Sequence, residues 1–467
     1  MEGRAACEFA AARGDPRRRR APYGTAGVRR QVAVARPLFA GGVRDIAAAM
    51  HPFPALATLP ARVPGPARLH RFPELAVTET EGVRETLRHL EVTELPVTVH
   101  RNAVLHPLGP WLGAWWQGGA QDEQGAFIPE TGLYHWAQSV PVASLEGGDP
   151  QPPVAMLDET LVWGGFLPAH HGHFIIDSLS RLWRWPVPGA HRLACIGKPD
   201  EYNPVMWDML AKAGVPRDAI LMLDRPTRVR ELIVPYPSSL CYAISSDAWA
   251  ATVRRVGDAA VPGAVERSGQ PLYLSRSRFA TAGYARGVAG EAVLEQVLRQ
   301  AGFAVAYPEE LDLAQAVALV RRHTTVVAQL GSALHWTAFT DAAPDIIGIA
   351  ATPVPASYLL CDSAVGARAH YIWGPDAGIA APQLPAVDAA QHSVALDLPA
   401  VVTELTSLGL LPAGTPVPAA GRRPRVEAQY LRHWHRILGE YARKRPEDAG
   451  FSAAQAEVAA RLARLGG

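Results

Sequence analysis

Two side chains in the segment HHGHFIIDSLSRLWRW (residues 170–185) can form a proton-transfer pair. His173 and Asp177 are four residues apart, and side chains at this spacing meet on one side of a helix. A carboxylate that orients an imidazole is a common way to build a general base. The same spacing also fits a histidine–aspartate contact on a solvated helix face, so the sequence leaves both interpretations open.

A second stretch, TVVAQLGSALHWTAF (residues 325–339), has the order of a strand, a glycine–serine turn and a helix. Gly331 lets the backbone approach a bulky ligand, and Ser332 can cap the helix and donate its hydroxyl. The first N–H groups of a helix have no partner within it and lie at the positive end of its dipole. Gly331, Ser332 and Ala333 therefore form a candidate anion site, although such turns also occur where nothing binds.

A third candidate is the pair of arginines that follows the predicted strand 272–274, in the order Ser275-Arg276-Ser277-Arg278. Ligands of parallel α/β sheets bind beyond the carboxyl ends of the strands. Arg276 and the Gly331 turn should therefore share one rim, where guanidinium groups and a helix N-terminus suit a diphosphate. Arg276 is the preferred ligand. Arg278 is second, because alternation at a strand end can point its side chain away.

The spacing of apolar residues predicts strands that alternate with helices, the pattern of parallel sheets covered on both faces. In the second half the expected strands are 272–274, 303–306, 325–328, 346–349 and 370–373, with helices at 290–301 and 313–322. We therefore expect an α/β fold whose second half is Rossmann-like, without the Gly-x-Gly-x-x-Gly fingerprint of dinucleotide sites. The C-terminal helices should pack back across the first half.

Composition divides the chain into four parts. Residues 1–49 are rich in Ala, Arg and Gly without periodicity, which predicts a disordered N-terminal extension. Residues 50–260 are expected to form an N-terminal α/β domain on the acceptor side, and residues 261–400 a C-terminal Rossmann-like domain. Residues 401–467 should form a linker and C-terminal helices. The boundary between the two domains falls in a stretch rich in Pro, Gly and Ser.

Charge and cysteine content argue against several classes of function. Lys+Arg 45 against Asp+Glu 44 gives a formal net charge of +1, which does not favour nucleic-acid binding through bulk charge. Cys7, Cys195, Cys241 and Cys361 are far apart and form no zinc or disulfide pattern. No run of about 18 apolar residues predicts a membrane span, and the start does not resemble a secretory signal. We expect a cytoplasmic location.

The three stretches together resemble the glycosyltransferases of family 61. HHGHFIIDSLSRLW is similar to the family's His-x-x-x-Asp helix with its following Arg-Leu. LYLSRSR, with Arg286 and Glu291 downstream, is similar to the family's Ser-Arg strand end and its later Arg and Asn-Glu. GF, PEELDL, Gln315 and the GSAL turn are similar to a third block. The resemblance covers roughly residues 161–349.

Three positions depart from the family pattern. Gly290 stands where Asn is usual, Leu330 where many members have His, and His335 at a position that is often Asn. They bear on the contacts to the base and the ribose rather than on the fold.

The resemblance implies a GT-B fold, in which two Rossmann-like domains face each other across a cleft. It implies inversion at the anomeric carbon with no required metal or other cofactor, and the sequence has no Asp-x-Asp motif to hold a divalent ion; Glu310-Leu311-Asp312 is the nearest approach. The donor would be a nucleotide-diphosphate sugar, with a UDP-sugar as first expectation. The acceptor would be a glycan or lipid-linked oligosaccharide. The compact chain without a signal and its high Ala, Arg and Gly content suggest a bacterial origin, which points to capsule or exopolysaccharide synthesis with peripheral association at the inner membrane.

The resemblance also assigns roles at the site. Asp177 as the base, with His173 orienting the acceptor, is slightly preferred to the reverse. His170 and His171 would line the same opening, and His335 would lie at the donor site. Arg286 is a donor-site candidate or the partner of a structural ion pair with Glu291.

Two other classes of function stay open. One is a non-catalytic polysaccharide-assembly protein on the same scaffold, which the altered positions would suit. The other is an unrelated α/β enzyme that uses the rim for a different phosphorylated ligand.

Overall fold

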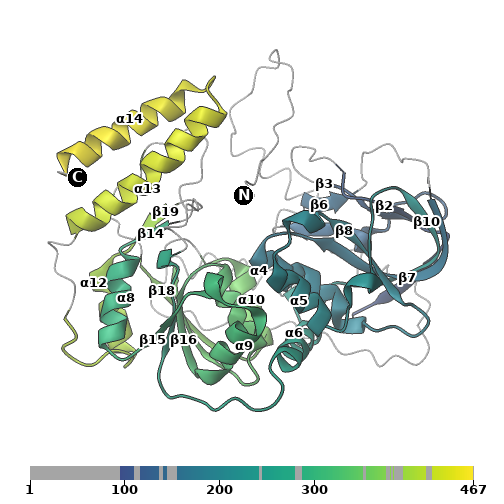
Figure 1. Ribbon diagram of the computed structural model, residues 1–467, viewed down its shortest axis with the longest axis horizontal. Coiled ribbons are helices and arrows are strands. Elements are labelled where there is room, and N and C mark those ends of the chain that lie inside the picture. Colours follow the sequence, from purple (N-terminus) through teal and green to yellow (C-terminus); the bar gives the residue numbers. More distant parts are fainter. Residues whose placement is uncertain are drawn as a thin grey trace, which may run out of the picture.

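The computed structural model describes residues 95–109, 116–135, 140–144, 155–240, 244–278, 287–350, 354–374, 379, 382, 393–416 and 423–465. The extension predicted at residues 1–49 lies outside them. Two main sheets with helices between and beside them make up the described chain (Figure 1). This mixture of parallel sheets and helices confirms the predicted α/β class.

The first main sheet comes from the N-terminal half. Its strands are β1 (Val97–Arg101), β2 (Val104–His106), β4 (Gly119–Gln121), β7 (Ala155–Leu167), β8 (Arg192–Gly197), β9 (Ile220–Met222) and β10 (Thr227–Pro235). Strands β10, β7, β8 and β9 run parallel side by side, while β1 and β2 pair with β10 in the antiparallel sense. The apolar run at 161–163 makes the centre of β7 fully buried, as a strand covered on both faces requires.

The second main sheet contains β15 (Ala304–Ala306), β13 (Leu272–Leu274), β16 (Thr325–Gln329), β17 (Asp345–Ala350) and β18 (Arg368–Trp373), in that spatial order. All four pairings are parallel. In chain order the sheet is 2-1-3-4-5, a doubly wound arrangement whose order reverses between β13 and β16. Ligands of such sheets bind at the carboxyl ends of the two strands that flank this reversal.

Helices connect the strands of the second sheet. They are α8 (Glu291–Gln300), α9 (Leu313–Arg322), the 3-10 helix η7 (Ser332–Phe339) and α10 (Ala356–Ala364). Helix α9 follows its sequence signals: Asp312 and Gln315 form a reciprocal capping box with bonds of 2.8 and 3.0 Å. Its predicted inward residues Ala316, Val317 and Val320 are buried, which confirms the periodicity.

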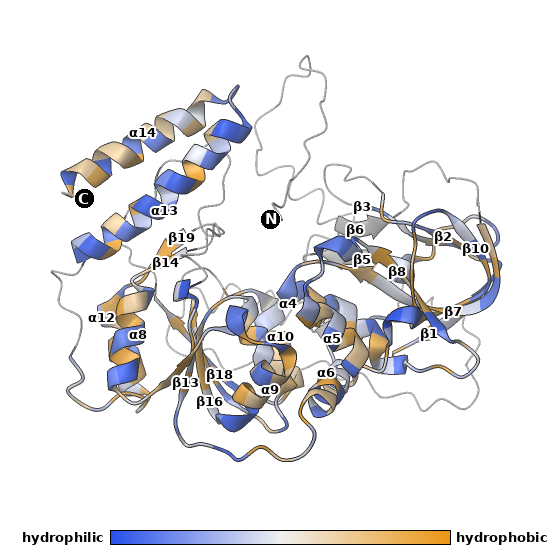
Figure 2. Cartoon of the chain, in the orientation of Figure 1, coloured by the Kyte–Doolittle hydropathy of each residue, from blue (hydrophilic) through white to orange (hydrophobic). Residues whose placement is uncertain are grey.

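One apolar core joins the two halves of the chain. Helices α5 (Pro204–Lys212) and α6 (Asp247–Ala260) lie between the sheets, and Figure 2 shows apolar residues on them in orange. Trp249 of α6 shares a buried cluster with Phe174, Val317 and Phe339. The predicted division at 260/261 falls directly after α6, between that helix and β13. The division into two domains stays a prediction. One apolar core continues across position 260/261, so the two halves share it.

The C-terminal helices pack on the second half, not across the first as expected. Helices α13 (Arg423–Lys444) and α14 (Ala449–Arg464) lie side by side (Figure 1). They share a core with α12 (Leu398–Ser407) and with the small sheet of β14 (Gly287–Ala289) and β19 (Ser393–Ala395). The apolar residues of α13, including Trp434, are buried against these neighbours.

Several shorter elements lie between these strands and helices. They are β3 (Trp116–Gln117), β5 (Leu133–His135), β6 (Val140–Ser144), β11 (Ser239–Leu240), β12 (Ile244–Ser245), and the 3-10 turns η1 (Pro129–Thr131), η4 (Pro199–Glu201), η5 (Arg217–Ala219) and η6 (Pro308–Glu310). Across the described ranges, no helix has both the length and the hydropathy needed to cross a membrane.

Candidate active site

The arginine after β13 meets the glycine turn after β16. A Cβ atom built on Gly331 would lie 2.5 Å from Nη1 of Arg276, so a residue larger than glycine would displace the guanidinium group. The backbone of Gly331 is extended, with φ 165°, so space rather than conformation calls for glycine here. The two strand ends flank the point where the sheet order reverses, and the predicted meeting on one rim is therefore present.

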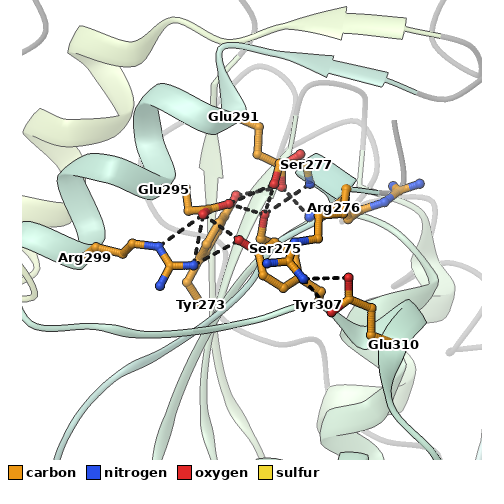
Figure 3. A network of polar contacts seen from close by, with 10 residues as sticks. Tyr273, Ser275, Arg276, Ser277, Glu291, Glu295, Arg299, Tyr307 and Glu310 are labelled. Atoms are coloured by element: carbon orange, nitrogen blue, oxygen red, sulfur yellow. Dashed lines mark hydrogen bonds and ion pairs between the residues drawn. The ribbon is translucent and has the colours of Figure 1, made fainter. Parts of the chain in front are cut away.

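A polar network holds the loop that carries Arg276 (Figure 3). Oε1 of Glu291 accepts hydrogen bonds from the backbone N–H of Arg276 at 2.7 Å and from the Tyr273 hydroxyl at 3.0 Å. The hydroxyls of Ser275 and Ser277 donate to Glu295 Oε2 at 2.9 and 2.8 Å. The side chain of Arg276 extends away from both carboxylates. The network thus fixes the backbone of Arg276, and the guanidinium group lies against the Gly331 turn.

Glu291 is an unusual member of this network because it is 1% exposed. Burial raises its pKa to about 7, and the bonds from Arg276 and Tyr273 only partly offset that effect. Its second oxygen, Oε2, has no hydrogen-bond partner among the described residues. The residue before it, Gly290, has a left-handed φ of 92°, a conformation that glycine and asparagine tolerate best. Gly290, at a position where the resemblance leads us to expect Asn, is therefore compatible with this backbone.

Arg278 has other partners. Its Nη1 binds both carboxylate oxygens of Glu310, at 2.7 and 2.6 Å, and its guanidinium lies 3.7 Å from the centre of the Tyr307 ring. The side chain is more than half exposed. This agrees with the expectation that alternation can direct Arg278 away from the rim. Arg286 lies outside the described residues.

The turn after β16 differs from the predicted α-helix start. The segment from Ser332 is a 3-10 helix, and its cap is Gly331, which makes no side-chain cap bond. The predicted capping role of Ser332 is therefore wrong, because the tighter helix begins one residue earlier. Its first bond runs from the N–H of Leu334 to the carbonyl of Gly331 at 2.9 Å. The N–H groups of Ser332 and Ala333 precede that bond and have no helix carbonyl to reach.

The His-x-x-x-Asp segment forms three successive helical turns of different pitch. They are α4 (His171–His173), the π-helical turn η2 (Phe174–Ser178) and the 3-10 helix η3 (Leu179–Arg184). Nδ1 of His173 lies 3.0 Å from Oδ2 of Asp177, the predicted contact. The Asp177 side chain is 0% exposed and the His173 side chain 26%. The solvated-face interpretation is therefore wrong for Asp177, and single π-helical turns often occur at functional sites.

Arg181 explains why the polar side of this segment can be buried. Its guanidinium donates to the carbonyl oxygens of Pro235 at 2.9 Å and Gly132 at 3.0 Å. Gly165 has a φ of 83°, and a Cβ atom there would lie 2.7 Å from Arg181 Cδ. Arg181 thus fixes the helical segment to the first sheet.

The histidine segment touches the glycine turn directly. A Cβ atom built on Gly172 would lie 3.1 Å from Cδ2 of His335 and 3.2 Å from the Ser332 hydroxyl. The His171 ring lies 4.7 Å from the Trp336 ring. The segment that follows β7 of the first sheet and the turn that follows β16 of the second sheet therefore form one contiguous site.

The imidazoles at this contact are mostly kept neutral. Burial lowers the pKa of His171 to about 4. Burial first, and then the charges of His173, His171 and His170, lower the pKa of His335 to about 3. The His170 and His173 rings are 4.9 Å apart. Among the described residues no group of His, Cys, Asp or Glu has an arrangement that could hold a metal ion.

Two aromatic residues at the site were not predicted. Tyr273 donates to Glu291, and Tyr358 of α10 stacks on His335 with ring centroids 4.6 Å apart and an interplanar angle of 14°. Tyr273 is the one polar residue in the apolar strand LYL, and that position was a usable signal. Strand β17 lies between the glycine turn and Tyr358 in the chain, and no local sequence pattern indicates that Tyr358 belongs to the site.

A family model matches part of the chain. The model of the family described as Glycosyltransferase 61 matches residues 171–347. The matched segment includes His173, Asp177, Arg276 and the Gly331 turn. No curated protein matches the chain.

Proposed function

Because the chain belongs to glycosyltransferase family 61, we propose that it transfers a sugar from a nucleotide-diphosphate donor to a hydroxyl group of a glycan or lipid-linked acceptor. The proposal includes inversion at the anomeric carbon, a GT-B arrangement of the two halves, no required metal, and a cytoplasmic role in bacterial polysaccharide synthesis. The observation that carries it is the contact of Gly172 with Ser332 and His335. Through that contact a proton-accepting pair lies beside an anion-binding rim.

The donor diphosphate would bind at the rim. Departure of a nucleoside diphosphate builds negative charge on the oxygen that leaves the sugar, and fixed cations and N–H groups can stabilise that charge. Arg276 supplies a guanidinium group against Gly331, and the first N–H groups of η7 supply donors. With no Asp-x-Asp in the sequence, these groups are the candidates for the role that a metal has in other transferases.

The proton acceptor in this proposal is His173, not the slightly preferred Asp177. Asp177 has no exposed side-chain surface, whereas His173 has 26%, and a base must come within hydrogen-bond distance of the hydroxyl. A carboxylate only accepts hydrogen bonds, so the bond to Asp177 assigns the proton to Nδ1 and leaves the lone pair on Nε2.

The reaction then balances as follows. The acceptor oxygen forms a bond to the anomeric carbon on the face opposite the diphosphate, and the bond from that carbon to the diphosphate oxygen breaks. The hydroxyl proton passes to Nε2 of His173, and Asp177 stabilises the resulting imidazolium. His171 and His335, whose pKa values lie near 4 and 3, stay neutral and add no repelling charge.

Calorimetry with UDP-, GDP- and dTDP-sugars in EDTA tests the donor site. One sugar nucleotide should bind, and Arg276→Ala should weaken it by roughly 10- to 100-fold, the range expected for hydrogen bonds to a charged group. Arg278→Ala is the matched control and should change the affinity little, because Arg278 pairs with Glu310. Binding that depends on added metal, or equal losses in both variants, would refute this site.

A further inference from the structure

Helix α13 has a row of arginines along its outer face. Arg425, Arg432, Arg436 and Arg443 are all exposed. They are spaced seven, four and seven residues apart, which places them within about 40° of one another around the helix. At about 1.5 Å per residue the row is roughly 27 Å long. We call these four residues the α13 stripe.

The orientation of this face is fixed by the packing of the helix. Leu431, Trp434 and Leu438 are buried in the core shared with α14. A Cβ atom on Gly439 would lie 2.6 Å from Gln455 of α14, so the two helices are in close contact. The α13 stripe therefore faces away from the protein body, and Figure 2 shows α13 as largely hydrophilic in its visible part.

The positive charge of α13 is concentrated relative to the chain. The helix has six basic and two acidic residues, a net charge of +4, whereas the whole chain has +1. Of its acidic residues, Glu427 binds Arg461 of α14 at 3.1 Å, and Glu440 binds Lys444 at 2.8 Å while it also interacts electrostatically with Arg443 and Arg436 of the stripe.

We propose that the α13 stripe docks the protein on the anionic headgroups of a lipid membrane. A convex helix face can touch a flat, charged surface along its whole length, and rows of basic residues are attracted to anionic lipids. The stripe itself has no aromatic side chain on which the bases of a single-stranded nucleic acid could stack. The partner fitted best is therefore a planar anionic surface, met without insertion.

The location of α13 connects this surface to the proposed donor rim. Gln429 of α13 accepts a hydrogen bond from the N–H of Gly290 at 3.0 Å, and the next residue, Glu291, holds the backbone of Arg276. Docking through the α13 stripe would bring the rim close to the lipid surface. This functional consequence, though not the docking itself, rests on the proposed transfer to a lipid-linked acceptor.

Co-sedimentation of the full chain with vesicles tests the proposal. Vesicles of phosphatidylcholine with phosphatidylglycerol should bind the protein at low salt and release it as salt rises, and phosphatidylcholine alone should not bind it. Each basic residue near an anionic membrane contributes roughly fivefold in partitioning. Replacing the four stripe arginines by glutamine should thus lower binding by roughly 600-fold.

The control makes the same charge change elsewhere on the surface, with glutamine at the exposed Arg101, Arg225 and Arg230 and at the half-buried Arg228. It should retain binding within a few fold. Wild-type-like binding of the stripe variant, equal losses in both variants, or tighter binding to duplex DNA than to vesicles at the same salt would overturn the proposal. Sugar-nucleotide binding, measured on the same proteins, checks the fold. If no protein binds a donor but the vesicle results hold, the transferase proposal fails and the docking surface stands.

Discussion

The neutral imidazole of His335 makes a quantitative prediction about acid stability. The side chain is 6% exposed and stacks on Tyr358. Its folded-state pKa is about 3, mainly because of burial, against 6.5 for an ordinary histidine. His335→Asn removes the titrating group and keeps a planar, polar side chain at this position.

The sign follows from proton binding. Below pH 6.5 the unfolded chain protonates this histidine and the folded chain does not, so acid favours unfolding. The contribution is fully present above the unfolded pKa and is lost progressively toward the folded pKa. At about pH 5 the loss corresponds to roughly 1.5 pKa units, or about 2 kcal/mol. Wild-type protein should therefore lose about 2 kcal/mol more than His335→Asn between about pH 7 and pH 5.

Urea unfolding followed by tryptophan fluorescence gives the free energy of unfolding of each protein at the two pH values. The prediction concerns how much more this free energy falls in wild type than in His335→Asn. The absolute change in wild type is not diagnostic, because Glu291 and Asp362, with pKa values raised to about 7, change stability in the opposite direction. Both proteins contain these carboxyl groups, so their effect cancels. Equal losses of stability in the two proteins would show that His335 is not held neutral, and the description of the site would be wrong.

Three further predictions concern the site. Gly331→Ala should push the Arg276 guanidinium aside and weaken donor binding, measured by calorimetry, roughly tenfold. An unchanged affinity would show that Gly331 has no part in donor binding. Asp177→Asn should lower kcat on the order of 10²- to 10⁴-fold with little change in donor Kd, because it removes support for the His173 imidazolium; a change in Kd alone would contradict this role. Between about pH 5 and pH 7, wild type should lose about 2 kcal/mol more stability than Glu291→Gln, because it must ionise a buried carboxyl group as the pH rises. Parallel pH profiles of the two proteins in urea unfolding would exclude that cause.

The rim was predictable from the sequence because it depends on local order. A short strand followed by Ser-Arg, and another followed by Gly-Ser, define carboxyl ends, and parallel pairing brings such ends to one edge. The capped helix α9 was predictable for the same reason, since Asp312 and Gln315 signal a start and the apolar spacing gives the buried face.

The burial of Asp177 and Arg181 was not predictable in this way. Periodicity separates polar from apolar faces, but it cannot say whether the polar face meets water or protein carbonyl groups. The partners of Arg181, Pro235 and Gly132, are 54 and 49 residues away in the chain. The change of pitch from α4 to η3 likewise results from packing on both faces, which no short sequence window contains.

Because one core joins the two halves, this enzyme cannot be divided between them into fragments that fold independently. Trp249 of α6 packs with residues of α9 and η7, and Arg321 of α9 reaches back to Asp258 at 2.7 Å and to the Phe339 carbonyl at 3.0 Å. A cut after Ala260 would expose apolar surface on both fragments and would separate Arg321 from Asp258, its ion-pair partner. The two halves should melt as one cooperative unit. A chimaera that exchanges the donor half would have to carry α6 with it, so the modular unit of this enzyme is larger than either sheet.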